Sequence, residues 1–302
     1  MEKFSRLFKI AMLAAIGFLL LNQAKRESVE AQKPTLSEEA PTKKISVRLA
    51  LDWVPEPEFG GFYAAKEGNE FAKRGLDVEL VPGGAGAPVV QMVSAGKFDF
   101  GTVSASEVIL SQDRGADVVA IFAVYQTAPN AIMTHEEQGY KSLADVFKSD
   151  GIVAMSKGQA YVAFLEKKYG FGKAKIVPYN GGVAEFLHNK KYSQQGFIFS
   201  EPILAKRQGA NPKTFLVADS GYNPYTTVLV TRKSVIAKDP ELVKSLVAGV
   251  RDGWASYLKD PKSTNEVMAK LNKTMDLQTF AEGAKAQHPL IETADTKRNG
   301  LG

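Results

Sequence analysis

The chain has 302 residues, of which 44% are hydrophobic and 24% are charged, the composition of an ordinary globular protein. That length accommodates one large domain or two of typical size. Cysteine is absent, which excludes disulfides, thiolate metal sites, iron–sulfur clusters and a cysteine nucleophile. The formal net charge of +5 is small and dispersed, so we expect no nucleic-acid partner.

The N-terminus has the pattern of a secretory signal peptide. Three positive charges among residues 1–9 precede Ile10–Leu21, an apolar run shorter than the about 20 residues of a membrane-spanning helix. Small residues favour cleavage after Ala31, with cleavage after Ala24 or retention as an uncleaved anchor as alternatives. We therefore predict a signal peptide over residues 1–31 and a periplasmic location for the mature protein.

Residues 32–44 are polar, contain two prolines and lack hydrophobic periodicity, which predicts a disordered leader. From Ile45 onward, short β-type runs alternate with helical patterns, as in an α/β fold with doubly wound sheets. This first set of elements ends near Pro129. Its predicted strands are Ser46–Leu51, Asp77–Val81, Phe98–Val103 and Val118–Val124, and its predicted helices are Phe62–Arg74, Pro88–Ala95 and Ala105–Gln112.

A second set of alternating elements begins after Pro129 and ends at the turn-rich aromatic segment Gly221–Tyr225. One more strong strand pattern follows at Thr227–Thr231, and the remaining chain is nearly all helical. The predicted strands of the second set are Gly151–Met155, Lys175–Pro178, Gly196–Phe199 and Thr214–Ala218. Its helices are predicted near Ser142–Lys148, Gln159–Tyr169, Val183–Asn189 and Pro202–Gln208, and the C-terminal helices at Asp239–Leu258, Ser263–Asn272 and Leu277–Gln287.

Two strand-rich halves, followed by helices that need an apolar surface to pack on, indicate an α/β protein with two lobes. We expect the C-terminal helices to return to the first lobe, so that the chain crosses between lobes twice, near Pro129 and near Pro224. Lobe 1 then comprises residues 45–129 and 225–302, and lobe 2 comprises residues 130–224. The two crossings would form a hinge.

Motifs of the common metal and cofactor enzymes are missing from the sequence. The three histidines, His135, His188 and His288, have no partner in a metal-ligand spacing. No nucleophile elbow, Walker loop or dinucleotide-binding motif occurs. The glycine-rich stretch Val81–Gly86 could cradle an anion but lacks a Lys-Ser/Thr partner, so a simple turn is the favoured interpretation. We predict no catalytic residues, no metal and no cofactor.

The segment Leu51–Tyr63, with sequence LDWVPEPEFGGFY, is the strongest candidate for a binding loop. It follows a predicted strand, and open α/β sheets bind ligands at the carboxyl ends of their strands. Its aromatic rings and carboxylates together suit a flat, nitrogen-rich molecule better than a sugar or a phosphate. Among all strand-end candidates Lys157 is the only cation, which disfavours an anionic ligand such as a sulfonate.

A carboxylate can accept two hydrogen bonds from the ring N–H and amino edge of a protonated aminopyrimidine. Aromatic rings would add stacking, or cation–π attraction of about 0.5–2 kcal/mol if the ring is charged. Each candidate taken alone could equally serve packing or, as an acid, the helix dipole. The candidate binding residues are Trp53, Glu58, Phe59, Tyr63, Ser104, Ser106, Tyr125, Tyr161, Tyr179, Glu201, Tyr222 and Tyr225.

The segment LDWVPEPEFGGFYAAKEGNEFAKRGLDVELVPGG and the later QMVSAGKFDFGTVSASEV resemble the NMT1/THI5-like (SsuA/THI5) group of ABC-transporter solute-binding proteins. The resemblance continues more loosely through Ser200-Glu201-Pro202 and Val228–Thr231. It implies a type II periplasmic-binding-protein fold, in which two α/β lobes close over a solute and present it to a membrane permease with its ATPase. Members bind thiamine pyrimidine precursors, riboflavin, or sulfonates such as taurine.

Carried over by position, the resemblance implies a stacking role for Trp53 and a first-lobe wall at residues 58–63. It also implies hydrogen-bond donors at Ser104 and Ser106, and a second-lobe wall at Glu201. Pyrimidine binders of the group often have a polar Asn/His turn where this chain has Pro-Glu-Phe, so the other solutes stay open.

The function expected from the sequence is that of a monomeric binding protein for ABC import, with a thiamine pyrimidine precursor as the first choice of solute. Riboflavin and a sulfonate such as taurine are the alternatives within this class. A periplasmic sensor without import is a further alternative. An enzyme of thiamine-pyrimidine synthesis is disfavoured, since the eukaryotic relatives with that activity carry a cysteine-rich motif and this chain has no cysteine.

Overall fold

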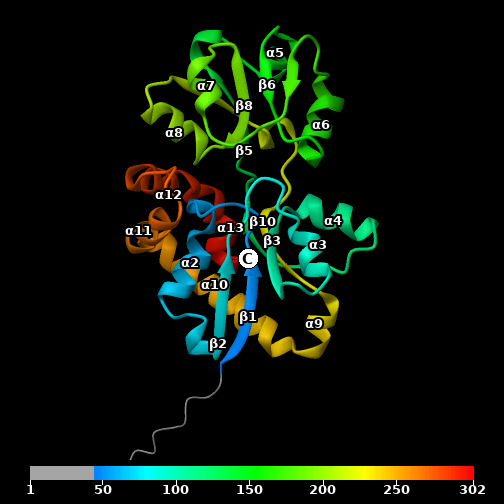
Figure 1. Cartoon of the computed structure of the whole chain (residues 1–302), viewed down its shortest axis with the longest axis vertical. Helices are drawn as coiled ribbons and strands as arrows, with labels where there is room; N and C mark the ends of the chain where they lie inside the picture. The colour runs from blue at the N-terminus through cyan, green and yellow to red at the C-terminus, as the bar shows by residue number, and fades with distance from the viewer. Residues whose placement is uncertain (1–43) are drawn as a thin grey trace, which may run out of the picture. The chain divides into compact units, whose positions relative to one another are not determined.

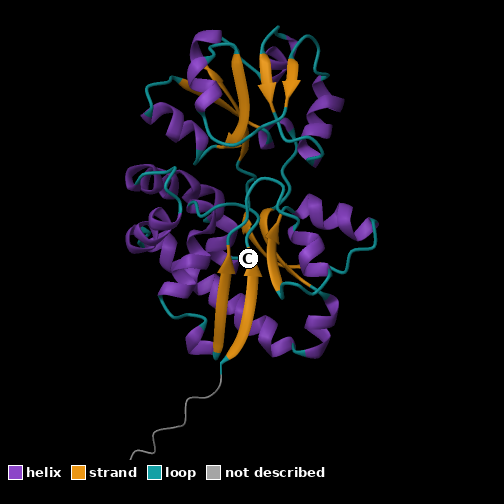
Figure 2. Ribbon diagram, in the orientation of Figure 1, coloured by secondary structure: helices purple, strands orange, loops and turns teal. Residues whose placement is uncertain are grey.

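The computed structural model describes residues 44–302, so the predicted signal peptide and the predicted leader up to residue 43 lie outside the described residues. Figure 2 shows the strands in two separate groups joined by loops. The described part is an α/β structure with two five-stranded sheets, in agreement with the predicted fold class. Among residues 44–302, no helix combines the length and the apolar composition needed to cross a bilayer.

The first sheet has the strand order β2-β1-β3-β10-β4. Strand β1 is parallel to β2 and β3, whereas β10 is antiparallel to both of its neighbours. Four of the five strands come from the first part of the chain, and the fifth arrives about a hundred residues later along the sequence. The strands are β1 (Ile45–Ala50), β2 (Leu76–Val81), β3 (Phe100–Val103), β4 (Val119–Tyr125) and β10 (Thr226–Thr231).

The second sheet has the strand order β7-β6-β8-β5-β9 and repeats this arrangement. Strand β6 is parallel to β7 and β8, and β5 is antiparallel to β8 and β9. The antiparallel strand of each sheet is the one that directly follows a passage of the chain from one sheet to the other. The strands are β5 (Asn130–His135), β6 (Ile152–Ala154), β7 (Lys175–Val177), β8 (Tyr192–Phe197) and β9 (Pro212–Leu216).

Helices cover both faces of the first sheet (Figure 1). One apolar cluster joins this sheet to α2, α10 and α12, and a second cluster joins its other face to α3 and α4. The C-terminal helices α10 and α12 therefore pack on the first sheet. These helices are α2 (Gly60–Glu67), α3 (Val89–Ser94), α4 (Ala105–Asp113), α9 (Lys233–Lys238), α10 (Pro240–Lys259), α11 (Lys262–Leu271), α12 (Leu277–Ile291) and α13 (Ala294–Asn299).

Around the second sheet lie α5 (Leu143–Lys148), α6 (Ala160–Tyr169), α7 (Ala184–His188) and α8 (Glu201–Arg207), as Figure 1 shows. Short 3₁₀ turns complete the fold at η1 (Pro57–Phe59), η2 (Ala72–Arg74), η3 (Glu136–Gln138) and η4 (Ala218–Ser220).

The close crossing of α2 and α10 explains the glycine pair in the predicted binding loop. A Cβ on Gly61 would lie 2.2 Å from the Trp254 ring, and a Cβ on Gly253 would lie 2.2 Å from the Gly61 carbonyl oxygen. No larger residue fits between these two helices. The crossing anchors the first turn of α2, and with it the binding loop that leads into that helix.

Several predicted elements differ from the structure. The helix predicted over Phe62–Arg74 is divided into α2 and η2, because Asn69 adopts a left-handed backbone with φ of 60°. Strand β5 was not predicted, and neither were α9 and α13. The predicted Gly196–Phe199 strand lies within and beyond β8, which begins four residues earlier. Its polar Ser193 and Gln194 are buried, which hides the strand from a hydrophobicity pattern.

Candidate ligand-binding site

The loop Leu51–Glu58, which we call the acidic loop, is held in place by backbone hydrogen bonds from three directions. The Leu51 amide donates to the Val81 carbonyl at 2.8 Å, and the Asp52 amide donates to Thr102 Oγ1 at 3.0 Å. The Gly83 amide donates to the Trp53 carbonyl at 3.0 Å. The loop is therefore fastened to β2, to β3 and to the glycine-rich turn after β2.

The C-terminal helices support the same loop from the other side. The amide of Asn272 donates to the Pro55 carbonyl at 3.0 Å, and that of Gln287 donates to the Pro57 carbonyl at 2.8 Å. Both side chains are buried, so these bonds are shielded from water. Two residues more than two hundred positions away along the chain thus shape the acidic loop.

We expect Gly83→Ala to destabilise the protein by about 1–3 kcal/mol, because overpacking a tight contact costs that much. A Cβ on Gly83 would lie 2.3 Å from the Leu51 carbonyl oxygen and 3.0 Å from the Asp52 carbonyl carbon. Thermal unfolding measures the loss. Gly84→Ala is the matched control, since a Cβ there meets nothing within 4 Å. Equal unfolding temperatures for the two variants would contradict the close contact at Gly83.

Four carboxyl groups gather at the acidic loop and the start of α8, and we call them the four-acid cluster: Asp52, Glu56, Glu58 and Glu201. Burial is the first cause of a raised pKa in each, and charge from another member of the cluster raises the pKa further in Glu56 and Glu58. Each carboxyl accepts a hydrogen bond from the hydroxyl of a residue on another element. Thr102 donates to Asp52, Ser200 to Glu56 at 2.7 Å, Thr227 to Glu58 at 2.7 Å, and Tyr179 to Glu201 at 2.7 Å.

The four-acid cluster has no cationic partner among residues 44–302. None of the ion pairs found there involves one of its carboxyls. Burial, together with the charge of Glu201, raises the pKa of Glu56 to about 8. Burial raises the pKa of Asp52 to about 6, and it raises the pKa of Glu58 well above its ordinary value. A partner that donates hydrogen bonds or carries positive charge would stabilise the ionised form of these carboxyls.

Trp53 lies within the acidic loop and is only partly buried. Its indole Nε1 donates to Glu56 Oε1 at 3.3 Å, and the other oxygen of Glu56 accepts from Ser200. Ser200 stands at the N-cap of α8, directly before Glu201. A chain of hydrogen bonds thus links an aromatic residue beside the first sheet to the segment that follows strand β8 of the second sheet.

Glu201 is held by two donors, the hydroxyl of Tyr179 and the amide of Phe197, which donates to Oε2 at 2.8 Å. The predicted pair Tyr179 and Glu201 is therefore brought together. The predicted Tyr161 does not bond Glu201. Its hydroxyl donates to Gln195 Oε1 at 2.5 Å. Burial, followed by the charge of Glu201, raises the pKa of the Tyr161 and Tyr179 hydroxyls, so both remain protonated donors.

The predicted serines have different surroundings. Ser104 caps α4, since its hydroxyl accepts from the Glu107 amide at 3.2 Å. Ser106 Oγ lies 2.7 Å from the Tyr222 hydroxyl, which joins the start of α4 to the segment that leads into β10. Tyr225 is half exposed, and its carbonyl accepts from the Ala105 amide at 3.0 Å.

Three of the predicted aromatic residues are part of the hydrophobic core. Phe59 and Tyr125 have no exposed surface, and Tyr63 is only 4% exposed. The Tyr125 ring stacks on Phe199 at 5.4 Å between centroids, and its hydroxyl donates to Gln287. In this structure Phe59 and Tyr125 therefore pack in the core beneath the candidate site.

Glu56 and three of the hydroxyl partners, Thr102, Ser200 and Thr227, are not among the residues predicted for the candidate site. Glu56 and Glu58 stand in the repeat Pro-Glu-Pro-Glu, and nothing in that repeat distinguishes them. The threonines belong to apolar strands, where threonine is common for its β-branched shape. Only the contacts between distant elements identify these residues.

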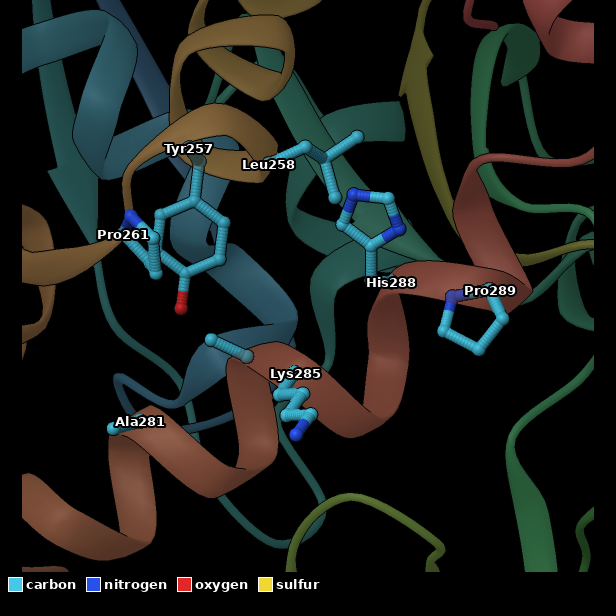
Figure 3. A pocket seen from close by; sticks show the side chains of 8 residues that line it. Tyr257, Leu258, Pro261, Ala281, Lys285, His288 and Pro289 are labelled. Atoms are coloured by element: carbon cyan, nitrogen blue, oxygen red, sulfur yellow. The ribbon is translucent and has the colours of Figure 1, made fainter.

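Two hollows lie elsewhere on the described part of the protein. The one in Figure 3 has a volume of about 410 Å³ and is lined by α10, by Pro261 and by α12, with Lys285 and His288 as its basic groups. No member of the four-acid cluster lines it or the other hollow. Within residues 44–302, no three His, Asp or Glu side chains group in a way that could hold a metal ion.

Comparison with known proteins identifies the family. The NMT1/THI5-like family model matches residues 56–264. The riboflavin-binding protein RibY of Chloroflexus aurantiacus is 24% identical over 85% of this chain and 76% of its own. The formylaminopyrimidine-binding protein of Halalkalibacterium halodurans is 28% identical over 86% of this chain and 77% of its own.

Among solved structures, the periplasmic aliphatic sulphonate binding protein SsuA from Escherichia coli superposes with a TM-score of 0.64. It is 17% identical, and the match covers 82% of this chain and 79% of that one. At this level of identity the likeness shows the fold alone. The chain therefore belongs to the NMT1/THI5-like family of solute-binding proteins and has the periplasmic-binding-protein fold.

Proposed function

We propose that this protein binds a small nitrogen-rich aromatic solute, with a thiamine-type pyrimidine precursor as the first choice, and delivers it to an ABC permease and its ATPase. The observation that carries the proposal is the four-acid cluster, whose carboxyls are held by hydroxyl groups and paired with no cation within residues 44–302. An aminopyrimidine supplies the amino and ring N–H donors that such acceptors need.

Two of the four carboxyls have one oxygen that accepts no hydrogen bond from residues 44–302 and is available to a solute. Asp52 Oδ2 and Glu58 Oε2 receive no hydrogen bond from residues 44–302, whereas both oxygens of Glu56 and Glu201 accept protein donors. Trp53 lies between these groups in sequence and is partly accessible. We propose that Asp52 and Glu58 accept from the solute while Trp53 stacks on its ring.

A sulfonate is the weaker candidate, although proteins of that specificity share the fold. A sulfonate requires arginine, lysine or several backbone amides as donors. The four-acid cluster offers it no positive charge, and Lys157, the only cation among the predicted strand-end residues, is exposed and pairs with none of the four acids. Riboflavin is the stronger alternative, because its ring N–H and its hydroxyl chain also donate hydrogen bonds.

Closure over the solute provides the mechanism of capture. The Glu56–Ser200 bond joins the acidic loop to the start of α8, so this contact belongs to a state in which the two walls approach. Affinity then reflects the extra contacts that a solute makes when the walls meet. We propose residues 45–129 with 225–302 and residues 130–224 as the moving lobes, and a monomeric protein exported to the periplasm.

The experiment is to express the full chain with its own N-terminus, purify the exported protein and identify co-purified small molecules by mass spectrometry. Calorimetry and thermal shift then compare formylaminopyrimidine, riboflavin and taurine. We expect formylaminopyrimidine to bind in the micromolar range or tighter and taurine not to bind. Binding of taurine alone would overturn the proposal. Turnover of a pyrimidine by the purified protein would favour an enzyme instead.

A further inference from the structure

Thr227 has an unusual backbone for a β-branched residue inside a strand. Its φ is 54°, in the left-handed region, although it is the second residue of the buried strand β10. Its neighbours keep their register, since Thr226 pairs with Tyr125 and Val228 pairs with Ala123 of β4. The pairing of these two neighbours is kept, although the register of the same strand pair shifts between Leu229 and Val230. The Cβ of threonine makes the left-handed conformation of Thr227 costly.

The distorted residue makes one contact that the acidic loop needs. Its side-chain Oγ1 donates to Glu58 Oε1 at 2.7 Å, although the two residues are 169 positions apart. Both partners are buried, with Thr227 1% and Glu58 4% exposed. Strain at a buried residue persists only where the surrounding structure enforces it, and it gathers at functional sites.

Among the groups around Glu58, the Thr227 hydroxyl has the opposite effect on the Glu58 charge from the neighbouring carboxyls. The carboxyls of Asp52, Glu56 and Glu201 act on Glu58 from the same loop and from α8, and the Tyr125 hydroxyl faces it from β4. The three carboxyls disfavour a charged Glu58. Within residues 44–302, the bond from Thr227 is the one contact that favours the anion, and it occupies Oε1 while Oε2 receives no donor from these residues.

We propose that Thr227 is a positioning residue for solute binding: its left-handed backbone aims the hydroxyl at Glu58 Oε1 and thereby presents Oε2 to the donor edge of the solute. This role rests on the proposed function. Thr227 would then determine the affinity for the solute although it does not contact the solute itself.

The test compares Thr227→Val, which keeps the shape and removes the hydroxyl, with Thr227→Ser, which keeps the hydroxyl. Formylaminopyrimidine binding is measured by calorimetry from pH 5 to 9. We expect the valine variant to bind about tenfold more weakly or worse at neutral pH, and the serine variant to stay within about threefold of wild type, because the valine leaves the buried Glu58 Oε1 without the donor that holds it.

The pH profile separates positioning from simple destabilisation. The Thr227 hydroxyl lowers the pKa of Glu58, so its removal raises that pKa and moves the pH midpoint of binding upward in the valine variant. The solute titrates in the same way in both experiments, so its own pKa does not contribute to the difference between the two pH midpoints. A packing defect would lower the unfolding temperature of the valine variant and leave the midpoint in place, which would overturn the proposal.

The outcomes for the two proposals are distinct. If wild type binds no pyrimidine, the proposed function fails and the role of Thr227 fails with it. If wild type binds and the valine variant binds equally well with the same midpoint, only the role of Thr227 is lost.

Discussion

Replacing Trp53 with alanine is expected to weaken solute binding at least about 100-fold, or about 2.8 kcal/mol, while the fold stays intact. The side chain is partly accessible, so the change leaves no large cavity in the core. It removes the stacking surface and also the Nε1 donor to Glu56 at 3.3 Å. Calorimetry with the solute that wild type binds best measures the loss, and thermal unfolding verifies the fold.

Trp53→Phe divides the effect into its two parts. Phenylalanine keeps a ring for stacking and lacks the indole N–H, so we expect an intermediate affinity. If Trp53→Ala binds with wild-type affinity, the tryptophan is a structural residue and the solute lies elsewhere.

The second large effect is a loss of stability of the solute-free protein as the pH rises. Burial, followed by the charge of Glu201, raises the pKa of Glu56 to about 8 in the folded protein, against an ordinary value of 4.5. The folded state therefore holds this proton more tightly than the unfolded state. Its contribution to stability is complete below about pH 4.5 and is lost as the pH rises toward 8. Asp52, raised to about 6, adds to the loss in the lower part of this range.

Glu56→Gln tests this linkage. Glutamine is neutral at every pH and keeps an oxygen that can accept from Ser200, so we expect a higher unfolding temperature than wild type at pH 8 and little difference at pH 4. Glu67→Gln is the matched control, because Glu67 is exposed at the end of α2. A gain of equal size at both pH values would show that Glu56 is not the group whose proton is lost.

The four-acid cluster affects both the stability of the solute-free protein and its binding of the solute. Unpaired buried carboxyls reduce the stability of the empty protein, and a cationic or donor-rich solute relieves that cost when it binds. The loss of stability with pH should therefore become smaller when the solute is saturating. If the site bound an anion, the loss of stability with rising pH would become larger when the solute is saturating.

The order and type of most elements could be predicted from the sequence, because apolar runs and amphipathic periods are local signals. Strand β5 was missed because it directly follows Pro129 at the passage between the sheets. Strands β8 and β9 were displaced in the prediction, since β8 carries buried polar residues whose partners come from elsewhere. Gln194, for instance, donates to the Gly182 carbonyl at 2.8 Å.

The candidate site was predicted in part. Trp53, Glu58, Tyr179 and Glu201 could be singled out, since they stand at strand ends and in family motifs. The core positions of Phe59 and Tyr125 could not be foreseen, because the same aromatic residue serves a wall or a core depending on what packs against it.

The sequence by itself determined the family, the α/β class and the acidic, aromatic character of the loop after β1, because these properties reside in contiguous residues. Only the tertiary structure decided that Glu56 belongs with Glu201, that hydroxyls from Thr102, Ser200, Thr227 and Tyr179 hold the four acids, and that no cation of residues 44–302 pairs with them. The physical reason is that protonation and hydrogen bonding depend on neighbours in space. Those neighbours are up to 169 residues apart along the chain.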